Sequence, residues 1–421
     1  MRTRSRVVVG LAVLALVVLA GCAGAGAGVD VDVGPLSFDD GALGPVWVSD
    51  TPANPGGSHH PAVAARADGE TYVATGFGDA GANVTCSFVV LNGSGGTRWT
   101  RAIPSDACGT QPTGDATFGD VNGDGRLDVV WATHERRLYA ADAASGRSVL
   151  NTSFPRGMPF VRPVVVDAPT RVVLPSMTGD VWAYRPNGSV AWHRSFPDNV
   201  RGQEPQVVTT ASGTRALVLG TTGGLVALDP ATGETLWRRH EPTRFLRAGT
   251  LDGRDVLVGT GQNAATDGAH VEAIAANGTR LWRHRSAGTG TLAVGAVGRP
   301  APDASARAYV TSTDGRLTAY DLATGRVVWN RTLDRERHYV PPPTLADLDG
   351  DGNRSVVATT GHGPMRAFDA ASGASRGVWG WEDEDVAVWA GLRSADLDGD
   401  GDDEVLAVTT DAQVIAVGDR E

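Results

Sequence analysis

Three short acidic segments carry oxygen-bearing side chains at a spacing that suits a divalent metal ion. They are DVNGDGRLD (120–128), DLDGDGNRS (347–355) and DLDGDGDDE (396–404). Oxygens at positions 1, 3, 5 and 9, with the backbone carbonyl of position 7, can surround a hard cation, and Gly at position 6 permits a sharp bend. This ligand set suits Ca²⁺ better than Mg²⁺, which prefers a compact octahedron. The sequence therefore predicts two to three structural calcium sites.

Each predicted site has five ligand residues. They are Asp120, Asn122, Asp124, Arg126 and Asp128; Asp347, Asp349, Asp351, Asn353 and Ser355; and Asp396, Asp398, Asp400, Asp402 and Glu404. The second set is the weakest, because Ser355 replaces the carboxylate of position 9. Position 12 is Trp131, Ala358 or Ala407, not the Glu of an EF-hand, and strand-like residues follow. The alternative interpretation is a solvated acidic turn in a generally acidic protein.

Carboxylate repulsion favours an occupied site. Two carboxylates about 4 Å apart repel each other by roughly 4 kcal/mol at an effective dielectric constant near 20. A folded loop without metal would therefore be strained, and a bound cation would relieve that strain.

The elements that must position these loops are short strands in a repeated phrase. The clearest copies are TGGLVALDPATGETLW (222–237) and GRLTAYDLATGRVVW (315–329). Asp opens the turn by hydrogen-bonding its own backbone, and Gly takes the left-handed conformation that rejoins the next strand. A Trp follows the turn glycine by four residues in five units, as Trp99, Trp192, Trp237, Trp282 and Trp329. Such a register indicates a repeat architecture.

Eight repeat units are visible, each with room for four strands. They start near residues 61, 112, 163, 205, 248, 292, 342 and 391. Four strands in about 40–50 residues are typical of a propeller blade. The eighth unit ends before its Trp strand, and residues 46–48 (Val-Trp-Val) near the N-terminus could complete it and remove an exposed sheet edge. We therefore predict an all-β, eight-bladed β-propeller closed by an N-terminal strand; the alternative is seven blades with an irregular extra unit.

The repeated phrase resembles the blade of the PQQ-like β-propeller superfamily over residues 44–421. The resemblance implies that the recurring Trp packs between neighbouring blades. The acidic segments resemble the calcium loops of FG-GAP and VCBS-type repeats, which join the first two strands of a blade, and Phe118-Gly119 before the first segment fits that pattern.

The superfamily includes quinoprotein dehydrogenases and a non-catalytic propeller lipoprotein of bacterial outer-membrane assembly, so the fold alone does not give the function. The resemblance implies a vicinal Cys-Cys disulfide beside the quinone in the dehydrogenases, and this sequence has no such pair. We therefore expect Ca²⁺ and not PQQ, and a non-catalytic scaffold for an envelope protein or a glycan. The alternatives are a PQQ-dependent dehydrogenase and a calcium-dependent, polysaccharide-active propeller. The match to G-x-S-x-G at residues 373–377 falls in a blade turn, which argues against a nucleophile.

The N-terminal residues have the features of a lipoprotein signal peptide. Arg2, Arg4 and Arg6 precede an apolar run, which ends in Leu-Ala-Gly-Cys at residues 19–22. We predict a signal peptide (1–21), a lipidated Cys22 at the start of a flexible tether (22–43), and an extracytoplasmic, membrane-anchored propeller (44–421). The alternative is an ordinary signal peptide with an incidental Cys22.

Composition fits an oxidising, extracytoplasmic location. Besides Cys22 the chain has Cys86 and Cys108, which are expected to pair there; the alternative is two unpaired thiols. The formal charge is −11, and all 37 basic residues are Arg. Such a surface repels nucleic acid, so no nucleic-acid partner is expected. An acidic chain without Lys is typical either of a halophilic protein or of GC-rich coding bias.

Overall fold

The computed structural model describes residues 43–51, 60–78, 86–109, 112–200, 204–243, 245–263, 268–286, 290–333, 340–380 and 386–419. The predicted signal peptide (1–21), Cys22 and the tether up to residue 42 lie outside the described residues. Within the described part, no helix is long and apolar enough to cross a membrane.

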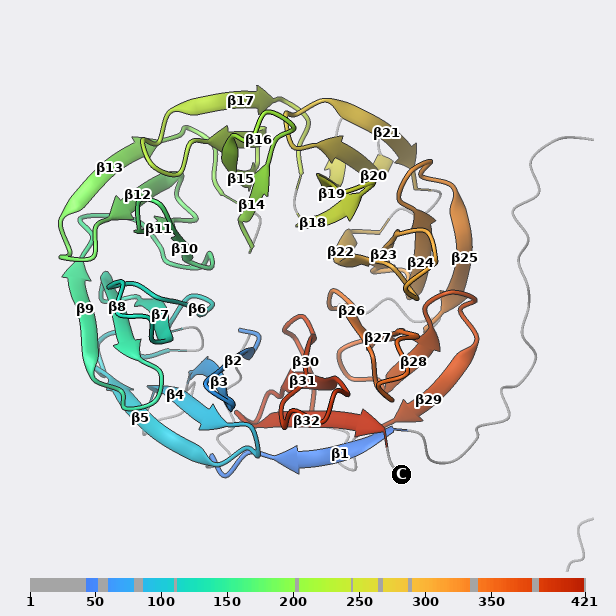
Figure 1. The fold of residues 1–421 in the computed structure, drawn as a ribbon, viewed down its shortest axis with the longest axis horizontal. Helices are drawn as coiled ribbons and strands as arrows, with labels where there is room; N and C mark the ends of the chain where they lie inside the picture. The colour runs from blue at the N-terminus through green and yellow to red at the C-terminus, as the bar shows by residue number, and fades with distance from the viewer. Residues whose placement is uncertain are drawn as a thin grey trace, which may run out of the picture. The chain divides into compact units, whose positions relative to one another are not determined.

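The described residues of the propeller form eight antiparallel four-stranded sheets (Figure 1). Blades 1 to 4 comprise β2 (Val63–Ala67), β3 (Glu70–Phe77), β4 (Cys86–Asn92) and β5 (Thr97–Ile103); β6 (Thr117–Gly119), β7 (Asp128–Thr133), β8 (Arg137–Asp142) and β9 (Ser148–Ser153); β10 (Val164–Val166), β11 (Arg171–Pro175), β12 (Asp180–Tyr184) and β13 (Val190–Ser195); and β14 (Gln206–Thr209), β15 (Arg215–Thr221), β16 (Gly224–Leu228) and β17 (Thr235–Arg239).

Blades 5 to 8 comprise β18 (Phe245–Leu251), β19 (Arg254–Asn263), β20 (Gly268–Ala275) and β21 (Arg280–Arg285); β22 (Leu292–Gly298), β23 (Arg307–Ser312), β24 (Arg316–Asp321) and β25 (Val327–Thr332); β26 (Thr344–Ala346), β27 (Ser355–Ala358), β28 (Met365–Asp369) and β29 (Ser375–Trp379); and β30 (Arg393–Ala395), β31 (Glu404–Val408), β32 (Val414–Asp419) and β1 (Leu43–Val48). The prediction of eight blades is confirmed, and the seven-bladed alternative is wrong.

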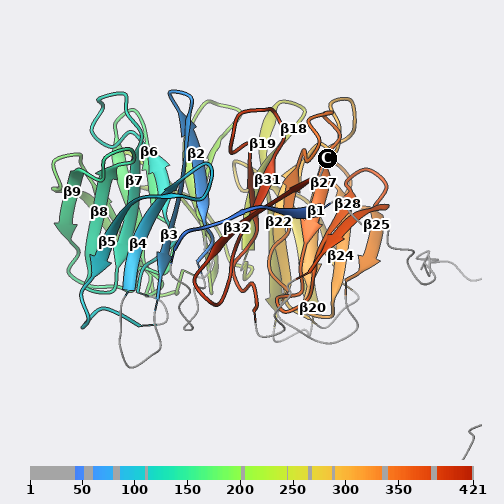
Figure 2. The ribbon, with the colours of Figure 1, turned by 90° about the horizontal axis from the view of Figure 1, so that it is seen from below.

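The last blade contains both ends of the described chain. Its strand order is β1-β32-β31-β30, and β1 pairs antiparallel with β32, with Trp47 opposite Ala416 and Val48 opposite Ile415. Figures 1 and 2 show β1 along the outside of β32. The predicted closure of the ring by the N-terminal strand is confirmed. Because β1 covers β32, the edge strands of blade 8 are β1 on the outside and β30 at the other end of the sheet.

The hydrophobic core is divided among the interfaces between blades. Within the described residues, one buried apolar cluster lies between each pair of neighbouring blades, the eighth joining blade 8 to blade 1 through residues such as Leu406 and Val73. Strand side chains alternate between the two faces of a sheet, so the middle strands of a blade bury apolar residues on both sides. This explains why β7, β12, β16 and β31 are buried along their whole length.

The recurring tryptophans join each blade to the next one. The indole Nε1 donates a hydrogen bond to a carbonyl in the following blade in all five units: Trp99 to Ala143, Trp192 to Pro230, Trp237 to Ala276, Trp282 to Leu322 and Trp329 to Ala370, at 2.7–3.2 Å. Each indole also lies against the turn glycine of that following blade. Trp47 of β1 makes the same contact with Gly95 of blade 1. The predicted packing of Trp between blades is therefore confirmed.

An arginine two residues after the tryptophan reinforces this contact. Arg101, Arg194, Arg239 and Arg331 donate to the carbonyls of Gly146, Gly233, Gly278 and Gly373 in the following blades, at 2.6–3.3 Å. These are the turn glycines that the tryptophans contact. A Trp-x-Arg pattern in the sequence thus marks the blade contact at four places.

Candidate functional site

All three acidic segments join the first and second strands of a blade. They connect β6 to β7, β26 to β27 and β30 to β31. Because neighbouring strands in a blade are antiparallel, such connections lie on the same face of the ring as the turns between third and fourth strands (Figure 2). The acidic segments therefore lie on one face, at equivalent places in blades 2, 7 and 8.

In blade 2, the side chains of the loop bond to its own backbone. The Asp120 carboxylate accepts hydrogen bonds from the amides of Gly123, at 2.7 Å, and Gly125, at 2.9 Å. Asn122 Oδ1 accepts from the Asp124 amide at 3.0 Å, and Asp124 Oδ1 accepts from the Arg126 amide at 2.9 Å. Gly123 and Gly125 have φ of 80° and 78°, values that favour glycine. The loop is thus wound around the oxygens at positions 1, 3 and 5.

The environment of Asp128, at position 9, indicates that this loop could hold a cation. It is 1% exposed, and its Oδ2 accepts a hydrogen bond from the Val121 amide at 2.9 Å. Its Oδ1 is buried and has no hydrogen-bond partner among the described residues. Burial raises the pKa of this carboxyl to about 6. A buried carboxylate oxygen without a partner is costly, and a coordinated metal ion would satisfy it. The residues present therefore fit a calcium ion.

The loop of blade 8 repeats this arrangement. Asp396, Asp398 and Asp400 each offer a carboxylate oxygen, and these oxygens lie within 4.8 Å of one another. The Asp402 amide bonds to Asp400 Oδ1 at 2.9 Å, and Glu404 Oε2 accepts from the Leu397 amide at 2.8 Å, as Asp128 does from Val121. Burial raises the pKa of Glu404 to about 7.

The loop of blade 7 lacks the position-9 carboxylate. Asp347, Asp349 and Asp351 form the same close group within 4.8 Å. The buried Ser355 Oγ accepts a hydrogen bond from the Arg376 guanidinium at 3.4 Å, and that guanidinium also lies 3.8 Å from Asp349. A fixed cationic side chain beside the loop competes with a metal ion, so this loop is the weakest of the three.

The loops of blades 7 and 8 contact each other. The Asp403 amide donates to the Asp347 carbonyl at 2.6 Å, and the Asp347 amide donates to Asp403 Oδ2 at 2.9 Å. A Cβ at Gly350 would lie 2.2 Å from Asp402 Oδ1, so Gly is needed for this approach. Burial raises the pKa of Asp402, and the charges of Asp400, Asp347 and Asp349 raise it further. The two acidic groups therefore repel each other across the blade interface.

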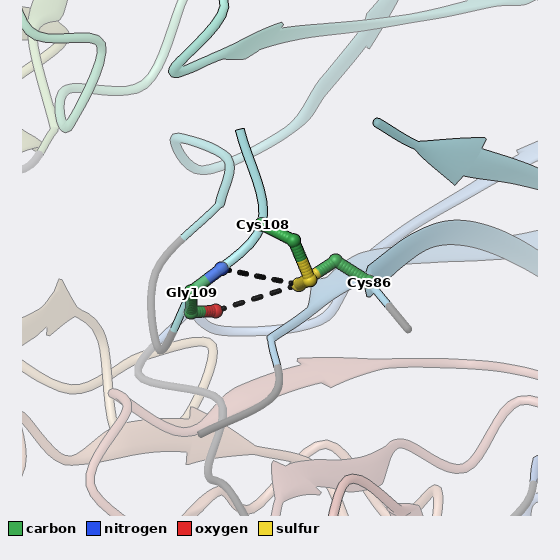
Figure 3. The surroundings of a disulfide bond; sticks show 3 residues. All are labelled: Cys86, Cys108 and Gly109. Carbon is green, nitrogen blue, oxygen red and sulfur yellow. Dashed lines mark hydrogen bonds between the residues drawn. A yellow bond between two sulfur atoms is a disulfide. The ribbon is translucent and has the colours of Figure 1, made fainter. Parts of the chain in front are cut away.

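On the other face of the ring, a disulfide joins Cys86, at the start of β4, to Cys108, beyond the end of β5 (Figure 3). The Cα atoms are 5.4 Å apart. The Gly109 amide donates to Cys86 Sγ at 3.3 Å. With Ile103 and Ala107, the two half-cystines form a small apolar cluster of their own. The disulfide thus attaches the segment after β5 to the blade.

The sequence of the chain matches a known family over most of its length. A family described as outer membrane protein assembly factor BamB matches residues 89–239 and 177–420 in two overlapping stretches. The chain belongs to this family. It is a PQQ-like β-propeller by sequence as well as by fold. No curated protein matches the chain significantly.

Solved structures share the propeller at low identity. BamB from Moraxella catarrhalis is 15% identical, with a TM-score of 0.59 over 89% of this chain and 97% of that one. The V. cholerae biofilm matrix protein Bap1 is 11% identical, with a TM-score of 0.63 over 91% and 92%. The quinohemoprotein alcohol dehydrogenase ADHIIG from Pseudomonas putida HK5 is 14% identical, with a TM-score of 0.60 over 90% and 76%. At these identities the likeness shows the fold alone.

Proposed function

We propose that this member of the BamB family is a membrane-tethered, extracytoplasmic scaffold without catalytic activity, whose ring is stabilised by two to three calcium ions and whose faces bind an envelope protein. Family membership supports the scaffold, since the family takes its description from an assembly factor. The observation that carries the calcium is the buried, unpartnered oxygen of Asp128 at the end of an oxygen-rich loop.

The calcium would act on the connections between strands. Asp120, Asn122, Asp124, the Arg126 carbonyl and Asp128 would hold one ion in blade 2, and the equivalent residues would hold ions in blades 8 and 7. An ion that binds only the folded state stabilises it by about 2.7 kcal/mol when its free concentration is 100 times its Kd. The contact between the loops of blades 7 and 8 means that a cation in one lowers the repulsion felt by the other.

Calcium titration tests this part of the proposal. Isothermal titration calorimetry of the purified full chain should show two to three sites, and a chelator should lower the melting temperature by several degrees. Asp124→Ala should remove one site, because Asp124 supplies a ligand oxygen. Asp124 is exposed, so its loss should leave the core intact. Asp303→Asn, in an exposed turn outside the loops, is the matched control for a lost charge. A chain that binds no calcium and melts equally with chelator would contradict the proposal.

The tether and the partner need separate tests. Cys22→Ser should release the protein from membranes into the soluble fraction while leaving its melting temperature unchanged. Pull-down from detergent-solubilised envelope, with and without calcium, should recover a protein partner. The rival functions would be recognised by dye-linked alcohol oxidation after addition of PQQ and calcium, or by release of unsaturated sugars from acidic polysaccharide. Either activity would overturn the non-catalytic assignment.

A further inference from the structure

Charged residues line the axis of the ring at the start of the innermost strands. They come from six blades: His60 of blade 1, Asp115 of blade 2, Arg162 of blade 3, Glu204 of blade 4, Arg247 of blade 5 and Arg393 of blade 8. The innermost strands begin on the face opposite the acidic loops, so this group is separate from the proposed calcium sites.

Three guanidinium groups converge on one carboxylate. Glu204, 8% exposed, pairs with Arg393, with Arg247 at 3.1 Å and with Arg162 at 4.0 Å. In a ring of eight, blades 4 and 8 are opposite each other, as β14 and β30 are in Figure 1. The Glu204–Arg393 ion pair therefore crosses the centre of the ring.

Backbone carbonyls hold two arginines of this group, Arg247 and Arg393, in place. Arg247 donates to the carbonyls of Gly295 and Leu246, both at 3.0 Å, and Arg393 donates to the carbonyl of Leu392 at 2.8 Å. These bonds fix the guanidiniums on their blades. Other N–H groups of the same guanidiniums face Glu204. The group is thus preorganised.

Among the described residues, positive charge exceeds negative charge at this place. His60 Nδ1 lies 2.7 Å from Asp115 Oδ1, and both side chains are buried. Three guanidiniums then share Glu204 and the more distant Asp115. Arg162 makes no hydrogen bond within the described residues, and its side chain is 30% exposed. Burial, together with the charge of Arg162, lowers the pKa of Arg247 and Arg393 to about 10, so both of these guanidiniums remain protonated at neutral pH.

The geometry points to a binding site for one small carboxylate or oxyanion at the centre of the ring, held by Arg162 together with Arg247 and Arg393. A guanidinium presents paired N–H donors that match the two oxygens of a carboxylate, and the unused donors of Arg162 supply them. Glu204 already shows how a carboxylate sits among these groups. The side chains of Arg247 and Arg393 are only 13% and 20% exposed, and this burial strengthens the attraction. This site is independent of the proposed calcium sites and of the scaffold function.

Calorimetric titration of the full chain with sodium succinate, and separately with sodium sulfate, at fixed ionic strength and low chloride, tests the inference. One equivalent of at least one probe should bind. Arg162→Gln should weaken it tenfold or more, and Arg162→Lys, which keeps the charge but loses the fork, should give an intermediate value. Arg185→Gln, in an exposed turn on the rim, should leave the binding unchanged.

Glu204→Gln should change the affinity for the probe in the direction opposite to that of Arg162→Gln. It removes the resident carboxylate and keeps the three guanidiniums, so the probe should bind more tightly than to the unaltered chain. Melting curves identify any variant that fails to fold. The variants that do fold still test the inference. Absence of binding by both probes, binding only after Glu204→Gln, or equal binding by Arg162→Gln and the unaltered chain would overturn the inference.

Discussion

Gly325→Ala tests the contact between a blade tryptophan and the next blade. Gly325 has φ of +71°, and an added Cβ would lie 2.5 Å from Cδ2 of Trp282. Gly253, in the turn between β18 and β19, has φ of +72° and no atom within 4 Å of such a Cβ. The two substitutions therefore impose the same backbone strain, and only one displaces an indole.

The expected losses follow from these contacts. A left-handed conformation in a residue with a Cβ costs about 1–2 kcal/mol, which is the whole effect expected for Gly253→Ala. Gly325→Ala also disturbs the 2.7 Å hydrogen bond from Trp282 to Leu322, worth about 1 kcal/mol, and overpacks the interface, which costs about 1–3 kcal/mol. Its free energy of unfolding should therefore fall by about 3–6 kcal/mol.

Urea denaturation followed by tryptophan fluorescence measures both losses. A double-mutant cycle with Trp282→Ala should show a coupling free energy of 1 kcal/mol or more, because removal of the indole makes room for the added methyl group. Equal losses for Gly325→Ala and Gly253→Ala, or a coupling near zero, would refute the idea that the tryptophan holds the blades together.

Three further predictions concern other parts of the ring. Replacing both Cys86 and Cys108 by Ala should lower the free energy of unfolding by about 3 kcal/mol in denaturant, since the bond closes a segment with a sequence separation of 22 residues; a loss below about 1 kcal/mol would count against it. Burial lowers the pKa of His270 from 6.5 to about 4, so the unfolded chain binds more protons between these values; stability should fall as the pH drops from 6.5 to 4, and the fall should be shallower in His270→Gln, whereas parallel pH profiles would contradict this. Ser355→Asp, which gives the blade 7 loop the carboxylate found in the other two, should tighten calcium binding at one site in calorimetry; an unchanged affinity would show that Arg376 and not Ser355 limits that loop.

The number and order of the blades could be predicted from the sequence because the signal is local. In five units the turn Gly and the following Trp are only four residues apart, and where an Asp opens the turn the structure shows its role: Asp229 accepts hydrogen bonds from the Ala231 and Thr232 amides. The acidic loops are local as well, and their place between the first two strands of a blade was predicted from their resemblance to FG-GAP and VCBS-type repeats. Whether they bind calcium is a property of a ligand, and it stays a prediction.

Contacts between distant units could not be predicted. Glu204 and Arg393 meet only because blades 4 and 8 are opposite each other, and neither residue stands in a motif. His60, which adjoins His59 in a segment without a metal-ligand spacing, is buried against Asp115 of the next blade. A weak signal did exist: His60, Arg162 and Glu204 each precede a Pro at the start of a unit. The contact between the blade 7 and blade 8 loops likewise depends on the closure of the ring.

Native-state hydrogen exchange at β1 tests the closure of the ring most directly. The amides of β1 that pair with β32 should be protected to a degree comparable with the amides of β32 itself, because both strands open only when blade 8 opens. Exchange of the Trp47 and Val48 region at the rate of an unstructured peptide, with β32 still protected, would show that the N-terminal strand does not complete the ring.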